Sequence, residues 1–280
     1  MKILLFWIVL AYSAFASAGV KEPAKAVLIF DYTSNTITEQ SNIHVSFPIA
    51  SVTKLMTVYT VLESRADLDQ LITIEKQQLE KSHVLRPGMK VTRKELISMS
   101  LIASDNLAAK TLALAHPTGY SDFLALMNAN AFKLGMFQTN YIDPTGLLLN
   151  VSSAWDLHLL NRAVSKYSVF NESAMSKHAN ADALNKKGLV QRFMIHNTNA
   201  FAGEYNIQVG KTGFTNPAGW CISMLIKHKN RDFDIIVLGS PNKQTRNKLT
   251  EQHLKNYMNF ITRLDVVNRI GTLDSYSDEN

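Results

Sequence analysis

A serine and a lysine lie three positions apart at Ser51 and Lys54. Pro48 precedes them, and the apolar residues that follow predict a helix beginning close to Ser51, because they recur at helical spacing at Leu55, Val58, Tyr59 and Leu62. Residues at i and i+3 share one helix face, so this spacing brings a hydroxyl and an amine together. Such a pair is a candidate nucleophile and base. At a helix N-terminus, unpaired backbone N–H groups also favour a developing negative charge.

The same Ser-x-x-Lys spacing occurs a second time, from Ser240 to Lys243. In this copy Pro241 directly follows the serine at the end of a predicted strand, and no second or third motif comes after it. A short motif without supporting context carries little weight. We therefore assign possible chemistry to Ser51 and Lys54 alone.

Two more polar clusters follow the first pair in the chain, Ser104-Asp105-Asn106 and Lys211-Thr212-Gly213. Each has a purely structural interpretation, because serine, aspartate and asparagine favour helix caps and Lys-Thr-Gly is an ordinary strand end. Together with Ser-x-x-Lys they form the set found in class A β-lactamases and penicillin-binding proteins. The predicted contexts are a helix start, a loop between helices and a strand edge.

Hydrophobic periodicity predicts strands at both ends of the chain and helices between them. Strands are expected at 26–30, 36–39, 206–212, 220–228 and 232–239, and helices at 92–104, 107–115, 121–134, 153–167 and 243–264. Residues 178–205 are expected to be irregular. The predicted fold class is α+β, an antiparallel sheet flanked by helices with an inserted all-helical subdomain over roughly residues 66–200. A cleft is expected between the two parts.

The N-terminus has the features of a secretory signal peptide. Lys2 is followed by an apolar run and then by Ala16-Ser17-Ala18, a small-residue cleavage site. We therefore expect residues 1–18 to be removed and residues 19–280 to form one exported domain with no stable membrane anchor. The lone Cys221 offers no internal disulfide.

Composition argues against several other functions. The formal charge of +6 comes from scattered residues rather than a basic stripe with aromatics, so nucleic acid is not expected as a partner. The eight histidines include no His-Glu-x-x-His motif and no Cys/His pair at ligand spacing, so neither a metal nor another cofactor is expected. Gly-x-Ser-x-Gly is absent, which counts against an α/β-hydrolase.

Four segments closely resemble the D-alanyl-D-alanine peptidases of the low-molecular-mass penicillin-binding protein family, in particular the short exported endopeptidase type. They are Ile49–Thr57, Ala103–Asn106, Asp143–Leu147 and Lys211–Gly219, and the resemblance spans nearly all of residues 25–265. It implies a β-lactamase/transpeptidase-like fold. Longer relatives carry a β-rich second domain and an anchoring helix after the catalytic domain, and we expect neither here, because only about fifteen residues follow the last predicted helix.

The resemblance implies roles for Ser51, Lys54, Ser104 and Asn106. Ser51 would attack the carbonyl of a D-alanyl peptide bond, and Lys54 would be the base. Lysine titrates near 10.4, so its pKa must fall by roughly three units, which burial and a second cation, Lys211, would supply. Ser104 would lie between the two lysines and relay a proton to the leaving amine, while Asn106 would hold Lys54 or the substrate amide.

Further implied roles concern substrate binding. Lys211, Thr212 and Gly213 would lie on an edge strand that substrate joins as an added strand, with the lysine and threonine suited to a carboxylate. The oxyanion hole would come from the backbone N–H groups of Ser51 and Phe214.

The implied activity is hydrolysis of D-alanyl bonds in peptidoglycan peptides, with cleavage of cross-links in the periplasm and covalent inhibition by β-lactams. A carboxypeptidase that removes terminal D-alanine is the first alternative. A β-lactamase is less favoured, because Glu172 and Glu204, the only glutamates between Asn106 and Lys211, lack the setting of the class A deacylating glutamate. A non-catalytic penicillin-binding module is also less favoured, because a protein without turnover has no need for two lysines in one cleft.

Overall fold

The computed structural model describes the backbone of residues 23–277 and the side chains of residues 23–264. The predicted signal peptide, residues 1–18, lies outside the described residues.

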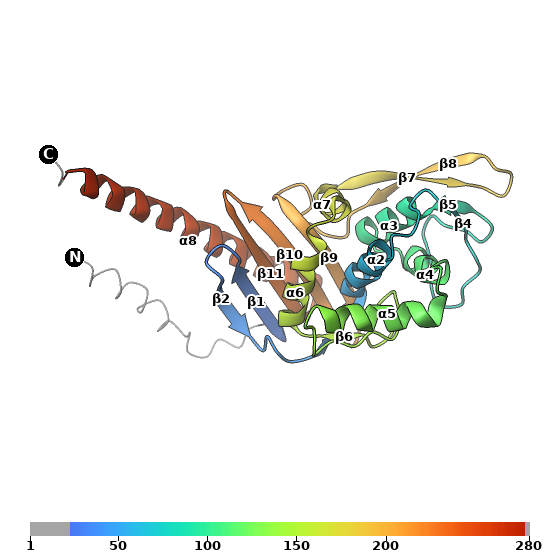
Figure 1. The fold of residues 1–280 in the computed structure, drawn as a ribbon, viewed down its shortest axis with the longest axis horizontal. Helices are drawn as coiled ribbons and strands as arrows, with labels where there is room; N and C mark the ends of the chain where they lie inside the picture. Colours follow the sequence, from blue (N-terminus) through green and yellow to red (C-terminus); the bar gives the residue numbers. More distant parts are fainter. Residues whose placement is uncertain (1–22, 278–280) are drawn as a thin grey trace.

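A five-stranded antiparallel sheet joins the two ends of the described chain, as Figure 1 shows. Its strand order is β2-β1-β11-β10-β9. The strands are β1 (Ala26–Asp31), β2 (Thr36–Ser41), β9 (Ile207–Thr215), β10 (Gly219–His228) and β11 (Arg231–Ser240). β1 pairs with β11, with Leu28 opposite Ile236, so the N-terminal hairpin extends a sheet built mostly by the C-terminal third of the chain. β9 is left at one edge.

Helices cover both faces of this sheet. α8 (Lys243–Ser277) packs on β10 and β11, and α6 (Ala154–Val164) packs on β1, β10 and β11. Alternate residues of the central strands belong to separate apolar clusters: Ile29 is in the cluster that contains Leu254 of α8, whereas Leu28 is in the cluster that contains Leu157 of α6. This alternation is the period of two that a sheet buried on both faces requires.

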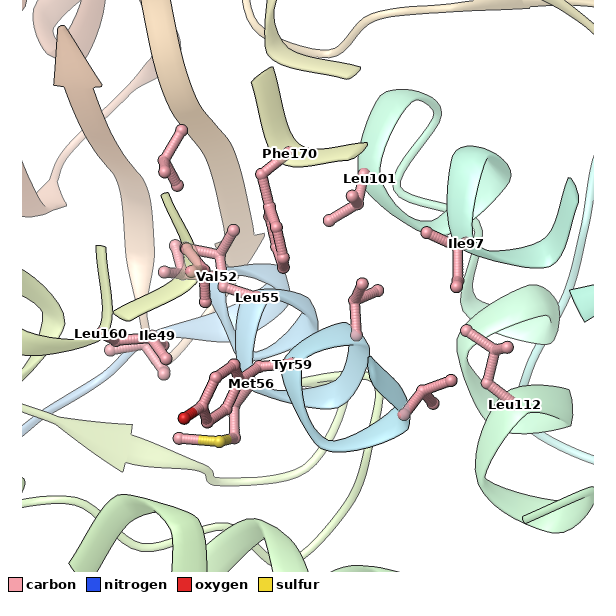
Figure 2. Close-up of a cluster of buried hydrophobic side chains, with 14 of the residues drawn as sticks. Ile49, Val52, Leu55, Met56, Tyr59, Ile97, Leu101, Leu112, Leu160 and Phe170 are labelled. Carbon is pink, nitrogen blue, oxygen red and sulfur yellow. The ribbon is translucent and has the colours of Figure 1, made fainter. Parts of the chain in front are cut away.

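The part of the chain between β2 and β9 forms a block of helices. It contains the short 3₁₀ turn η1 (Ala50–Thr53), α2 (Lys54–Glu63), α3 (Arg93–Ile102), α4 (Asn106–Leu114), α5 (Tyr120–Lys133) and α7 (Ser168–Met175). α2 is buried along eight consecutive residues, from Lys54 to Val61. Figure 2 shows Leu55 and Tyr59 of α2 among apolar side chains that include Ile97, Leu112 and Phe170. A helix buried all round holds its side chains rigidly, which suits a site at its N-terminus.

The α+β class is as predicted, but the insert is not all-helical. A second, four-stranded sheet is built from β4 (Leu71–Thr73), β5 (Lys90–Thr92), β7 (His178–Leu184) and β8 (Val190–His196). The expectation of irregular structure over residues 178–205 is therefore wrong for 178–196, whereas 197–205 form turns and loop as expected. The inward side chains of β7 are alanines, such as the buried Ala181 and Ala183, so the alternation that marks a strand is weak in the sequence. A short pair, β3 (Phe47–Pro48) with β6 (Val151–Ser152), lies just before η1.

The last helix continues past the predicted end near residue 264 and reaches Ser277. Among the described residues, none of the helices combines the length and apolar character that crossing a bilayer requires.

Candidate active site

The serine and lysine of the first motif meet at the junction of η1 and α2. Ser51 lies in η1, and Lys54 is the first residue of α2. The Nζ of Lys54 lies 2.9 Å from the Oγ of Ser51. The contact is the one that the i, i+3 spacing predicts.

Two more acceptors hold the Lys54 amine. Nζ lies 2.7 Å from the Oδ1 of Asn106 and 2.7 Å from the carbonyl oxygen of Thr145. The side chain is fully buried, and burial lowers the pKa of Lys54 to about 7, while the carboxylates of Asp143 and Asp105 oppose this shift. A lysine with such a pKa has a substantial neutral fraction at neutral pH, which a general base needs.

The third motif places a second buried amine in the same site. Lys211 of β9 donates to the Oγ of Ser104 and to the carbonyl oxygen of Thr212, each at 2.9 Å. Burial holds the pKa of Lys211 well below its usual range, and the positive charges of Lys54 and Arg246 add to the effect. Like-charge repulsion between the lysines thus bears on the pKa of Lys211, whereas burial is the main cause of the low pKa of Lys54.

In the Ser104-Asp105-Asn106 motif, the middle residue caps a helix and the two outer residues contact the buried lysines. Asp105 is a helix cap, because its carboxylate accepts the backbone N–H of Ala108 at 2.9 Å at the start of α4. Ser104 and Asn106, on either side of it, contact Lys211 and Lys54 respectively. Ser104 has a φ of 56°, in the left-handed region that a non-glycine residue rarely adopts. Strain of this kind concentrates at functional sites.

Two glycines lie tightly against the backbone around Ser51. A Cβ on Gly146 would lie 2.0 Å from the carbonyl oxygen of Ala50 and 2.9 Å from the nitrogen of Ser51. A Cβ on Gly213 would lie 2.7 Å from the carbonyl oxygen of Ile49 and 3.0 Å from the nitrogen of Ser51. Only glycine fits either position. The third motif predicted that Gly213 belongs to the site, whereas no motif predicted that Gly146 packs against the backbone of Ser51.

The loop that contains Gly146 is folded around one carboxylate. Asp143 accepts the backbone N–H groups of Thr145 at 2.9 Å and Gly146 at 3.0 Å, as well as the Thr145 hydroxyl. Aspartate bonding to backbone two or three residues on is typical of such turns. The folded loop aims the Thr145 carbonyl at Lys54. The Asp-Pro-Thr-Gly-Leu segment is visible in the sequence, but a backbone carbonyl has no sequence signal.

β9 presents a free edge beside Ser51. The hydroxyl of Thr212 bonds to that of Thr198 at 2.8 Å, and Phe214 is 46% exposed with its ring stacked on Trp220 at 4.3 Å between centroids. An extended chain can add to such an edge by main-chain hydrogen bonds. No motif in the sequence indicated Thr198, which contacts Thr212, or the buried Arg246 of α8, whose charge acts on Lys211.

The two glutamates considered for a β-lactamase role lie on the surface. Glu172 and Glu204 are exposed, and Glu204 pairs with Lys177 at 3.8 Å. The geometry therefore gives no support to a deacylating glutamate at either position.

Comparisons with known proteins agree with this geometry. A family profile described as D-alanyl-D-alanine carboxypeptidase matches residues 14–242. The D-alanyl-D-alanine endopeptidase of Escherichia coli is 33% identical over 79% of this chain and 72% of its own length. The D-alanyl-D-alanine endopeptidase of Haemophilus influenzae is 30% identical over 91% of this chain and 90% of its own.

Two solved structures share the fold. A single-residue mutant of the Streptomyces K15 DD-transpeptidase superposes with a TM-score of 0.78 at 25% identity, covering 85% of this chain and 98% of its own. Penicillin-binding protein D2 of Listeria monocytogenes in its ampicillin-bound form gives 0.73 at 26% identity, with the same coverage. The match of the profile over most of the sequence shows that this chain belongs to the D-alanyl-D-alanine carboxypeptidase family.

Proposed function

We propose that the protein is a serine peptidase that hydrolyses D-alanyl bonds of peptidoglycan peptides through an acyl-enzyme at Ser51, with cross-links as its preferred substrates. The observation that carries this proposal is the buried Lys54 amine 2.9 Å from the Ser51 hydroxyl, with a pKa of about 7. The names of two similar relatives, both D-alanyl-D-alanine endopeptidases, favour cross-link cleavage.

In the first step neutral Lys54 takes the proton of the Ser51 hydroxyl while Oγ bonds to the carbonyl carbon of D-alanine. Negative charge moves to the carbonyl oxygen. The backbone N–H groups of Ser51 and Phe214 are the proposed donors to this oxyanion. The tight packing of Gly213 and Gly146 on the Ser51 backbone supports a rigid position for the first of these donors.

In the second step the C–N bond breaks, and the leaving amine receives the proton that Lys54 took, through the Ser104 hydroxyl. The bond from Lys211 to Ser104 at 2.9 Å supports this role, because it holds the hydroxyl in place. Water then attacks the ester, one of its protons returns to Ser51, and a free D-alanyl carboxylate is released.

The edge of β9 is the proposed substrate platform. The peptide would pair with the backbone along Lys211, Thr212 and Gly213. The side chain of Asn106 would also hydrogen-bond the substrate amide. The side chains of Lys211 and Thr212 would bind a substrate carboxylate. β-Lactams would acylate Ser51 as substrate mimics, and the ampicillin-bound relative supports this expectation. We further propose that residues 1–18 direct export to the periplasm.

Incubation with purified, cross-linked muropeptide dimers tests the proposal. Conversion of dimers to monomers is expected, with loss of activity in Ser51→Ala. Release of terminal D-alanine with intact cross-links would instead establish the carboxypeptidase that the family description names. If the protein binds penicillin at Ser51 but cleaves neither bond, it is a penicillin-binding module without peptidase activity.

A further inference from the structure

The segment that joins β4 to β5 makes a contact with the second motif that the mechanism above does not use. We call residues 75–86 of this segment the 75–86 loop. Within it, the hydroxyl of Ser82 bonds to the carboxylate of Asp105. The same Oγ accepts the backbone N–H groups of Val84 at 3.1 Å and Leu85 at 2.8 Å.

These partners determine the direction of the Ser82–Asp105 bond. A serine hydroxyl has one proton and two acceptor lone pairs. Because Val84 and Leu85 occupy the acceptor sites, the proton is donated to Asp105. A hydroxyl polarised by two donors is a stronger donor itself, and the acceptor here is a buried carboxylate, 8% exposed.

Asp105 connects this bond to the reacting lysine. One carboxylate oxygen accepts from Ser82, and the other caps α4 through the N–H of Ala108. α4 begins at Asn106, whose Oδ1 lies 2.7 Å from the Nζ of Lys54. The contacts therefore run without a gap from the 75–86 loop to the proposed base.

We propose that Ser82 is a positioning residue for acylation, which holds the Asp105 cap and thereby fixes the Asn106 amide against Lys54. The inference rests on the proposed roles of Ser51 and Lys54. Ser82 does not touch the reacting atoms; it acts through Asp105 and the start of α4. A small displacement of a group that holds a general base slows the reaction strongly.

The 75–86 loop has a second attachment that serves as an internal control. Glu80 lies 3.5 Å from the Nζ of Lys110, which also donates to the hydroxyl of Tyr120 at 2.9 Å. This attachment holds the same loop to α4 one full turn away from Asn106, without touching Asp105. Glu80→Gln therefore weakens the loop but leaves the Ser82–Asp105 bond intact.

The test compares Ser82→Ala, Ser82→Thr and Glu80→Gln with the unchanged protein. The acylation rate of Ser51 by a fluorescent penicillin is measured in each, with thermal unfolding as a check of the fold. We expect Ser82→Ala to acylate about tenfold more slowly. Ser82→Thr keeps the hydroxyl, and Glu80→Gln keeps an oxygen that can accept from Lys110, so both are expected to stay within about twofold of the unchanged protein.

Three results would overturn the inference: a normal rate in folded Ser82→Ala, no recovery in Ser82→Thr, or equal slowing in Glu80→Gln, which would indicate general ordering of the loop. The proposed function is tested separately by muropeptide cleavage in the unchanged protein. A protein that is acylated quickly but cleaves no muropeptide would contradict that function and leave the Ser82 comparison fully measurable.

Discussion

Gly146 lies directly against the peptide group that leads into Ser51, so close that a Cβ there would be 2.0 Å from the carbonyl oxygen of Ala50. The neighbouring Ala50 has a φ of 48°, so the backbone before Ser51 is both strained and clamped. The clamp comes from a loop almost a hundred residues further along the chain.

Gly146→Ala is expected to lower the acylation rate by about a hundredfold or more, because the new methyl must displace the Ser51 backbone. Gly188→Ala is the matched control. Gly188 has a φ of +78°, close to the +82° of Gly146, but a Cβ there meets nothing within 4 Å. Both variants carry the same backbone cost, so equal acylation rates would refute the clamp. Penicillin labelling measures both.

Acylation is expected to depend on pH through Lys54. The neutral amine is the active form, and its pKa is about 7, so the rate rises with pH, nearly tenfold per unit well below 7, and levels off above it. Lys54→Arg removes the base because guanidinium stays protonated. Stopped-flow acylation at saturating β-lactam from pH 5 to 9 measures this rise of the acylation rate with pH. A rate in the unchanged protein that is flat across this range would exclude Lys54 as the base.

Lys211→Ala is expected to slow acylation as well as weaken binding, because Lys211 holds Ser104 and lies close enough to Lys54 for their charges to interact. A loss of about tenfold or more in the saturating rate is anticipated. Lys227→Ala, an exposed lysine of β10, controls for net charge. If only the half-saturating β-lactam concentration changes, the proposed coupling between the lysines is wrong.

The acyl-enzyme formed with penicillin is expected to persist, because Glu172 and Glu204 are exposed and Glu204 is paired with Lys177. Mass spectrometry should detect the adduct on Ser51 for many minutes after excess drug is removed. Glu204→Gln should leave its lifetime unchanged. Rapid turnover of a chromogenic cephalosporin would contradict this expectation and favour a β-lactamase.

Stability is expected to depend on a buried network centred on Asp234. Asp234 of β11 is fully buried and accepts from Tyr32 at 2.6 Å and Asn161 at 2.9 Å, with the Nδ1 of His158 at 2.8 Å. Asp234→Ala leaves these groups without their partner and should lower the free energy of unfolding by about 3 kcal/mol. Denaturant titration measures this loss.

The exposed pair Asp182 and Arg192 supplies the control for that change. Asp182→Ala breaks a bidentate contact at 2.8 Å, but on the surface, and should lower the free energy of unfolding far less than Asp234→Ala does. Equal losses in the two variants would show that the buried network contributes nothing special. Acylation by the folded Asp234→Ala protein should be normal.

The sequence by itself determined the features that short-range geometry controls. The contact between Ser51 and Lys54 follows from helical spacing. The sequence Thr92-Arg-Lys-Glu95 has the Thr-x-x-Glu pattern of a capping box, and the Thr92 hydroxyl accepts the N–H of Glu95 at 3.2 Å. The α+β order of elements follows from periodicity. The two strands within residues 178–196 were not predicted, because alanine is weakly apolar and its alternation with polar residues gives little contrast.

Only the tertiary structure decided how the site works. The low pKa of Lys54 comes mainly from burial, which depends on packing from many parts of the chain. The bond from Lys211 to Ser104 joins residues 107 positions apart, and the Ser82–Asp105 contact and the Gly146 clamp have no sequence signal. Chain neighbours fix which side chains share a helix face, but desolvation and close backbone approach exist only once distant segments are packed together.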